Sequence, residues 1–153
     1  MNTPGTSPAR LFGDHFLHAL EPQERAMLER VRELAASTFG PQAAEVARKD
    51  AFAWDTFRTL AREGIVATAF PREYGGSDAR QVLRIRIIEE LGRVCSTSAS
   101  IITGTDLSSR AIVAGASEDL QRQIVPGLCS GELQSAFALT VPEAGSDGRG
   151  LKT

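Results

Sequence analysis

The sequence predicts an all-α fold: about six helices, followed by one strand near the C-terminal end. Apolar residues recur at steps of three and four over most of the chain, which is the spacing of a helix with one buried face. Glycine and proline interrupt the pattern at short intervals, which favours several short helices over a few long ones. The last apolar run, LQSAFALT at 133–140, has the length and character of a buried strand.

Composition and charge exclude several classes of protein. The 153 residues are 42% apolar and 24% charged, the balance of a globular domain that buries a core. There are 17 Lys and Arg against 19 Asp and Glu, which argues against a nucleic-acid-binding protein because such proteins carry a basic face. No apolar run approaches the ~20 residues that span a bilayer, and the N-terminus shows no secretory signal. We therefore expect a cytoplasmic protein with no membrane span.

The first part of the chain predicts an arm and three helices. Residues 1–20 are rich in Pro, Gly, Ser and Thr and are expected to form a flexible arm. A helix is expected to begin near Glu21, and Gly40 and Pro41 are expected to end it, with a short helix after them. A further helix is predicted in WDTFRTLAREG at 54–64, with Gly64 as its C-cap. The positions expected to face the core in these helices are Met27, Leu28, Val31, Leu34, Ala35, Thr38, Phe57, Leu60 and Ala61.

A break at Pro71 and Gly75–Gly76 precedes the next helix, which is expected to bury Ile85 and Leu91. Its charged residues are interpreted as a solvated face. These are Arg80, Arg84, Glu89, Glu90 and Arg93. The remaining two helices follow, and in the second of them Pro126 is expected to bend or end the helix.

The segment STSASIITGTDLSSRAIVAGA at 96–116 has the length of a helix but places Ser and Thr where a surface helix would carry charges. Small hydroxyl residues between apolar ones suit a helix that is buried on most sides. The sequence alone leaves two reasons open, which are close packing between helices and a ligand beside the helix.

No metal site and no catalytic residue is predicted. Cys95 and Cys129 lack the paired spacing of a structural zinc site, so they are expected to be small buried hydrophobes. His15 and His18 stand three residues apart, but two histidines alone do not supply a set of ligands. The sequence also lacks a nucleophile with a neighbouring base, or a carboxylate pair spaced for acid–base work.

The chain closes with ALTVPEAGSDGRGLKT at 138–153, an apolar run that leads into a bend. Gly145 has no side chain, so the backbone there can approach another molecule closely. Thr140 and Ser146 supply hydroxyls that donate or accept hydrogen bonds, and Asp147 is expected to stabilise the turn through its own backbone. These residues fit either an ordinary turn or a loop that binds a ligand.

Three stretches in register carry a family resemblance. FALTVPEAGSDGRGLKT resembles the T-E-P-x-A-G-S-D signature of acyl-CoA dehydrogenases, and REGIVATAFPREYGG and IIEELGRVCSTSAS resemble two earlier stretches of the same family. The resemblance covers residues 20–153. It implies a helical N-terminal domain over 21–132, and a strand with a flavin-contact loop over 133–153 that begins a β-barrel domain.

The resemblance implies FAD as the cofactor and an acyl-CoA thioester as the substrate. The positions that match flavin contacts are Phe137, Leu139, Thr140, Gly145 and Ser146. Ser146 also matches a contact to the CoA arm, and Ser100 and Thr103 resemble positions on the helix that lines the acyl pocket. Two residues depart from the pattern, because Val141 replaces a Glu and Glu143 replaces a small residue.

Family members continue into a barrel and a four-helix domain that supplies the catalytic carboxylate, and no residue here matches that base. The resemblance implies the N-terminal portion of a dehydrogenase that removes an α-proton and passes a β-hydride to flavin N5. We expect this portion to be inactive alone, to assemble with chains that supply the missing domains in a homo- or hetero-oligomer, and to use electron-transfer flavoprotein as acceptor. The alternative is a non-catalytic helical interaction module, or a partner subunit, derived from the same family.

Overall fold

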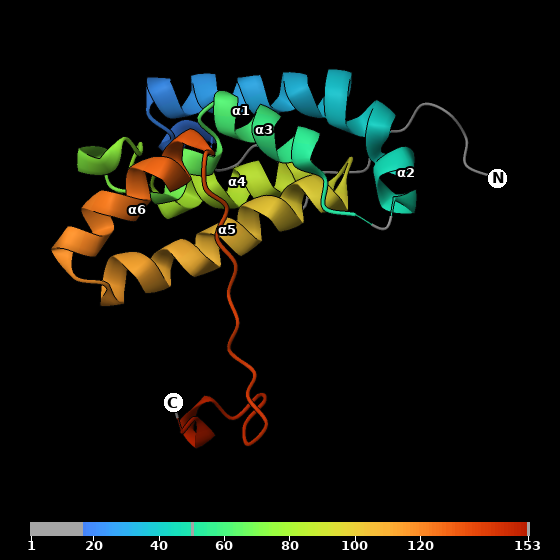
Figure 1. Cartoon of the computed structure of the whole chain (residues 1–153). Helices are drawn as coiled ribbons and strands as arrows, with labels where there is room; N and C mark the ends of the chain where they lie inside the picture. The colour runs from blue at the N-terminus through green and yellow to red at the C-terminus, as the bar shows by residue number, and fades with distance from the viewer. Residues whose placement is uncertain (1–16, 50, 153) are drawn as a thin grey trace.

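The computed structural model describes residues 17–49 and 51–152, and within them it forms an all-α fold, as predicted (Figure 1). Short 3-10 turns join the helices, and no paired β-strands occur in the described ranges. The helices are α1 (Pro22–Leu34), α2 (Gly40–Arg48), α3 (Trp54–Arg62), α4 (Gln81–Gly92), α5 (Ser96–Gly115) and α6 (Glu118–Ser130).

The first helix begins where the sequence predicts. Pro22 occupies the first turn of α1, where a missing N–H leaves no hydrogen bond unmade. The backbone N–H of Glu21 donates to Glu24 Oε2 at 2.9 Å, which satisfies one of the free groups at the helix start. The predicted arm is shorter than expected, because Leu17–Ala19 form a 3-10 turn and Leu20 is buried in the core. Residues 1–16, including His15, lie outside the described residues.

The prediction that Gly40 and Pro41 end the first helix is wrong. A wide π-helical turn over Ala35–Phe39 joins α1 to α2 without a break, and the Gly40 N–H donates to the Ala35 carbonyl. Pro41 falls in the first turn of α2, where the loss of its N–H costs little. A Cβ on residue 40 would lie 3.0 Å from the Ala35 oxygen, so glycine suits this position, where the backbone of the π-helical turn approaches closely. Figure 1 shows α2 turning away from the axis of α1 at this point.

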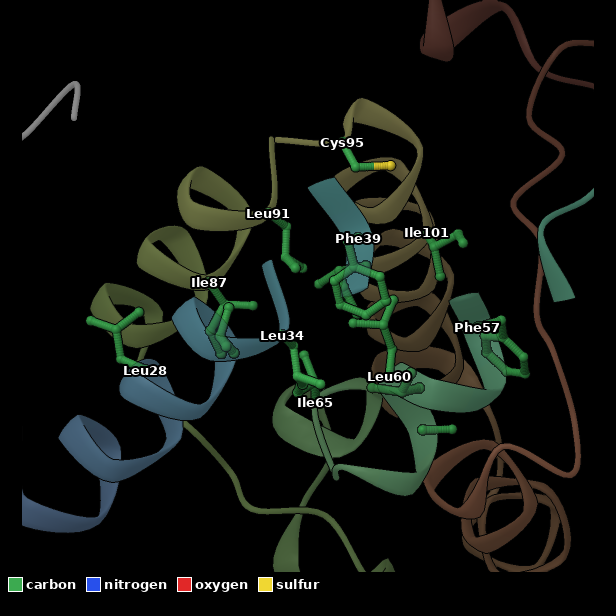
Figure 2. Close-up of a cluster of buried hydrophobic side chains, with 14 of the residues drawn as sticks. Leu28, Leu34, Phe39, Phe57, Leu60, Ile65, Ile87, Leu91, Cys95 and Ile101 are labelled. Atoms are coloured by element: carbon green, nitrogen blue, oxygen red, sulfur yellow. The ribbon is translucent and has the colours of Figure 1, made fainter. Parts of the chain in front are cut away.

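The main core lies between α1, α3, α4 and α5. Figure 2 shows Leu34, Ile87 and Leu91 pointing into one cluster with Phe39. A second cluster lies under α6 and contains Phe70, Val125, Leu128 and Cys129. Both cysteines are buried and free, as predicted. Among the residues predicted to face the core from the first and third helices, those that are buried are Leu28, Val31, Leu34, Ala35, Phe57, Leu60 and Ala61.

The predicted orientation of α4 is partly wrong. Ile85 is 43% exposed, whereas Arg86 and Glu90 are only 2% and 3% exposed. The interpretation of Glu90 as part of a solvated face therefore fails. Its carboxylate accepts hydrogen bonds from Arg32 Nε and Arg93 Nη1, both at 2.8 Å. A charged side chain can be buried when partners of opposite charge and hydrogen bonds surround it.

The hydroxyl-rich segment forms one helix of 20 residues, α5. Only one of its faces is buried, so the expectation of burial on most sides is wrong. The buried Thr105 hydroxyl donates to the Ile101 carbonyl at 2.9 Å, which is how the helix satisfies a polar group inside the core. The expectation that Pro126 could end its helix is not met. Pro126 is exposed and lies inside α6, which continues to Ser130.

The strand predicted over 133–140 is not formed in the described part of the chain. The Leu133 N–H donates to the Gly127 carbonyl at 2.9 Å, and the chain then runs extended and leaves the helical body, as Figure 1 shows. A strand requires a neighbour to complete its hydrogen bonds, and none of the described residues provides one. We call residues 134–140 the extended segment.

Candidate functional site

The residues expected to contact a flavin lie on the extended segment and the loop after it. Phe137 and Leu139 are 43% and 42% exposed, which is unusual for large apolar side chains. Side chains two residues apart in an extended chain point to the same side, so these two form a small apolar surface. Thr140 is also exposed and adds a hydroxyl at the end of this surface.

A tight turn follows the extended segment. The Val141 N–H donates to the Ala144 carbonyl at 3.0 Å, and the Ala144 N–H donates back to the Val141 carbonyl at 3.2 Å. Pro142 and Glu143 lie exposed at its tip. The turn is therefore held by backbone atoms of Val141, and a valine in place of a glutamate is compatible with it.

Gly145 and Ser146 are exposed beyond this turn. A Cβ on residue 145 would meet no atom of the chain within 4 Å, and the backbone there does not have a positive φ. Neither packing nor backbone conformation within this chain requires glycine at 145, so the open space is available to another molecule. The Asp147 carboxylate accepts from the Arg149 N–H at 3.1 Å, which confirms its predicted role in the turn.

The exposed face of α5 is uncharged along most of its length, and we call it the α5 face. Its members are Ser100, Thr103, Gly104, Leu107, Ala111 and Ala114. Ser100 and Thr103, the two residues expected to line an acyl pocket, lie here about one turn apart. The Thr103 hydroxyl donates to the Ala99 carbonyl at 2.9 Å, so the helix itself uses its proton.

One side-chain hydrogen bond joins α5 to the extended segment, and it starts from a buried position of α5 rather than from the α5 face. Ser108 Oγ, on a side chain that is 3% exposed, and Ser135 Oγ lie 2.6 Å apart. The chain after the extended segment lies away from α5 (Figure 1). Neither serine is among the residues expected to bind flavin or substrate, so this bond does not by itself bring those residues together.

One edge of the α5 face carries charges that the sequence analysis missed. Asp106 pairs with Arg84 of α4, and Asp106 Oδ2 lies 3.6 Å from Arg110 Nε. Burial lowers the pKa of Arg84, and the charge of Arg110 lowers it further. Asp106 and Arg110 stand four residues apart on one helix, and this spacing was the available signal for their pairing. Two arginines share one carboxylate, so this edge has an excess of positive charge.

The described residues provide no built metal site and no reactive thiol. No group of three or more His, Cys, Asp and Glu side chains is placed to hold a metal within 17–49 and 51–152. Burial raises the pKa of the Cys129 thiol to about 11, so it is protonated at neutral pH. Across the described helices, none is both long and apolar enough to cross a membrane.

Comparisons with known proteins identify the family. The N-terminal domain model of the acyl-CoA dehydrogenases matches residues 21–132. The probable acyl-CoA dehydrogenase FadE25 of Mycobacterium tuberculosis is 32% identical over 137 residues, which are 90% of this chain and 35% of that protein. The acryloyl-CoA reductase (NADH) of Anaerotignum propionicum is 32% identical over 132 residues, or 86% of this chain and 34% of that protein.

A solved structure agrees with the fold. The butyryl-CoA dehydrogenase from Megasphaera elsdenii superposes with a TM-score of 0.76 at 23% identity, over 88% of this chain and 36% of that one. The chain spans about a third of the length of the curated relatives that it matches, at 35% of the first of them. Because the domain model covers most of the chain and the helical fold agrees with it, this chain belongs to the acyl-CoA dehydrogenase family, whose N-terminal domain it contains.

Proposed function

We propose that this chain is the N-terminal portion of an FAD-dependent acyl-CoA dehydrogenase and forms one wall of its active site. The observation that carries the proposal is the surface presented by Phe137, Leu139 and Thr140, together with the open space at Gly145. Exposed apolar side chains and free backbone on a chain of this family are consistent with a binding surface. The family membership of the chain supports the same reading.

The residues present fit a flavin by their chemistry. Phe137 and Leu139 would lie against the apolar part of the isoalloxazine ring, and Thr140 would direct its hydroxyl and backbone N–H to the polar edge. Gly145 would let the backbone approach the cofactor without steric conflict. When bound, FAD supplies the acceptor for the hydride that leaves the substrate. Ser146, exposed beside Gly145, would supply a hydroxyl to the cofactor or to the CoA arm.

The α5 face would bind the acyl group of the substrate. Ser100, Thr103 and Leu107 form a surface without charge, and such a surface suits a hydrocarbon chain and excludes water from the carbons that react. The two relatives described above are named for opposite directions of reaction, yet both names specify an acyl-CoA. The CoA thioester class of substrate is therefore better supported than the direction.

This portion would position cofactor and substrate but would not remove the proton. Asp106, the carboxylate beside the α5 face, is held by Arg84 and Arg110 and is not available as a general base. We propose that the base comes from a region outside these 153 residues, on the same polypeptide or on a partner chain of a homo- or hetero-oligomer. We also propose the cytoplasm as its location and electron-transfer flavoprotein as its electron acceptor.

The test is to purify the protein from its own cells under native conditions and analyse it by mass spectrometry and visible absorption. The proposal expects bound FAD, carried by a polypeptide or assembly larger than 153 residues. Addition of butyryl-CoA or palmitoyl-CoA without oxygen is then expected to bleach the flavin absorption. A native protein that carries no flavin would favour the alternative, a non-catalytic helical module.

A pair of matched variants tests the position of the flavin. Gly145→Val fills the open space, and we expect it to weaken FAD binding at least tenfold. Gly148→Val is the control, because a Cβ there also meets no atom within 4 Å. Equal FAD affinity in the two variants would contradict the assignment of Gly145 to the flavin loop.

A further inference from the structure

Ser135 and Ser108 form a side-chain hydrogen bond between the extended segment and α5. Ser108 Oγ lies 2.6 Å from Ser135 Oγ, and either hydroxyl can be the donor. Ser108 Oγ also lies 3.0 Å from the Gly104 carbonyl and 3.1 Å from the Thr105 carbonyl of its own helix. Ser108 is only 3% exposed, and the bond as a whole is partly buried.

Among the described residues, this bond is the last hydrogen bond along the chain that joins the extended segment to the helical body. The Leu133 N–H is bonded to the Gly127 carbonyl at 2.9 Å, and the next backbone hydrogen bond is the internal one between Val141 and Ala144. Over the described part of the chain, no backbone hydrogen bond connects residues 134–140 to α5 or α6. The path of the segment across α5 in Figure 1 is thus fixed by Leu133 and then by Ser135.

We propose that Ser135 and Ser108 are positioning residues that set the flavin-contact segment against the acyl-binding helix; this inference rests on the proposed function. Ser135 precedes Phe137 by two residues, a distance of at most ~7 Å along an extended chain. Ser108 follows Leu107 directly on α5. The bond therefore connects the two elements, the extended segment and α5, that would hold the flavin and the acyl group. Neither serine contacts a reacting atom in this arrangement.

Such a connection matters because hydride transfer depends steeply on geometry. A displacement of about 1 Å between reacting groups can lower a rate ~100-fold. Without the Ser135 hydroxyl, the extended segment would turn more freely about Leu133. The position of Phe137 and Thr140 relative to the α5 face would then be less well defined, while the acyl-binding surface itself would be unchanged.

The first test is limited proteolysis of the native full-length protein without added FAD, with cleavage followed within residues 134–141. We expect Ser135→Ala and Ser108→Ala each to raise the cleavage rate several-fold, and the double variant to add nothing further, since one bond is lost in all three. Ser135→Thr retains a hydroxyl and is expected to restore resistance to cleavage. Cleavage of Ser135→Ala at the wild-type rate would overturn the proposal.

Ser109→Ala is the matched control. Ser109 is also buried on α5, but its hydroxyl bonds only to the Thr105 and Asp106 carbonyls of its own helix. It is expected to leave cleavage of the extended segment unchanged. If this variant raised the cleavage rate as much as Ser108→Ala, the effect would come from loosening of α5, and the role of the serine pair would be refuted.

The second test separates positioning from stability. In the native enzyme, Ser135→Ala is expected to lower kcat about tenfold and to leave KM for butyryl-CoA within twofold, because the acyl surface is intact. An unchanged kcat together with faster cleavage of the segment would overturn the positioning role. A native protein without FAD would refute the proposed function instead, and the proteolysis result would still decide whether the serine pair holds the segment.

Discussion

Arg32 on α1 and Glu90 on α4 meet in the interior, with 2.8 Å between Arg32 Nε and Glu90 Oε1. The second oxygen of Glu90 accepts from Arg93 Nη1 at 2.8 Å, and Arg86 Nη2 lies 3.7 Å from Oε1. Burial opposes the charge of Arg32, but the hydrogen bond and charge of Glu90 outweigh it and hold the Arg32 pKa above its ordinary value. One carboxylate thus balances several guanidinium groups at the junction of two helices.

We expect Glu90→Gln to lower the free energy of unfolding by about 3–5 kcal/mol, because it removes the charge of a buried carboxylate that accepts hydrogen bonds from Arg32 and Arg93. Chemical denaturation monitored by circular dichroism measures this change. Glu33→Gln is the control, since Glu33 pairs with Arg30 at 3.1 Å on the surface, where its side chain is 67% exposed, and its loss is worth less than about 1 kcal/mol. Similar losses in the two variants would show that burial of Glu90 is unimportant.

Gly76→Ala is expected to destabilise the fold by about 3 kcal/mol or more. A Cβ on residue 76 would lie 2.0 Å from the Phe70 carbonyl oxygen, a backbone atom that cannot rotate away. Gly104→Ala should do the opposite and stabilise by about 0.5–1 kcal/mol, because residue 104 lies in α5 with nothing within 4 Å of an added Cβ. Thermal unfolding of the two variants checks the sign, and two shifts in the same direction would contradict this account.

The pH dependence of stability should include a contribution from Glu24. A hydrogen bond from Arg80 is the largest cause that lowers the pKa of Glu24 from its ordinary value of 4.5, and it outweighs the opposing effect of burial. A carboxyl with a depressed folded-state pKa stabilises the fold above its unfolded pKa and loses that contribution as the pH falls through the folded pKa. Wild type is therefore expected to exceed Glu24→Gln in stability at pH 7.

The difference between the two proteins is expected to shrink steadily as the pH falls below 4.5, the ordinary value of the carboxyl. Urea denaturation at a series of pH values from neutral to acid measures it. Because Arg80 is partly exposed, the difference should also decrease with added salt. A difference that stays constant across the acid range would show that Glu24 does not titrate at a lowered pKa in the folded protein.

Both cysteines should resist modification in the folded protein. Cys95 and Cys129 are buried, and the pKa of Cys129, raised to about 11, leaves little thiolate to react at neutral pH. Treatment with a maleimide at pH 7 is expected to add no label to the native protein. The same treatment in guanidinium chloride should add two labels to these residues, as counted by mass spectrometry. Rapid labelling of Cys129 in the native protein would contradict the packing under α6, and rapid labelling of Cys95 would contradict the packing of the main core.

Local signals in the sequence predicted the features that depend on local physics. Pro22 marks the start of α1, and the Asp147 carboxylate accepts from the Arg149 N–H at 3.1 Å in the turn where it was expected to act. Gly40 and Pro41 gave a wrong prediction for the end of the first helix, because the π-helical turn before them depends on how Phe39 packs in the core. The sequence of one helix does not show which of its turns will be widened by packing against neighbouring helices.

The errors in α4 and in the extended segment have a different origin. Ile85 was expected inside and Glu90 outside, but Arg32, which stabilises the buried carboxylate, lies 58 residues away in the chain. The extended segment has strand character without a neighbouring strand in the described residues. The bond between Ser108 and Ser135 joins residues 27 apart, and their types give no sign of the contact. The flavin and acyl residues were selected by family resemblance, and their assignments remain predictions.

The edge formed by Arg84, Asp106 and Arg110 has a kinetic consequence. Asp106 compensates one of the two arginines, so a net positive field extends from this edge over the uncharged α5 face. At physiological ionic strength such a field reaches about 8 Å before ions screen it. A polyanion such as an acyl-CoA would be drawn toward this side of the helix before any contact forms, and its capture would slow as salt is added. The charges at this edge would thus raise the rate at which an anionic ligand reaches the helix, while the neutral α5 face would determine which ligand stays bound.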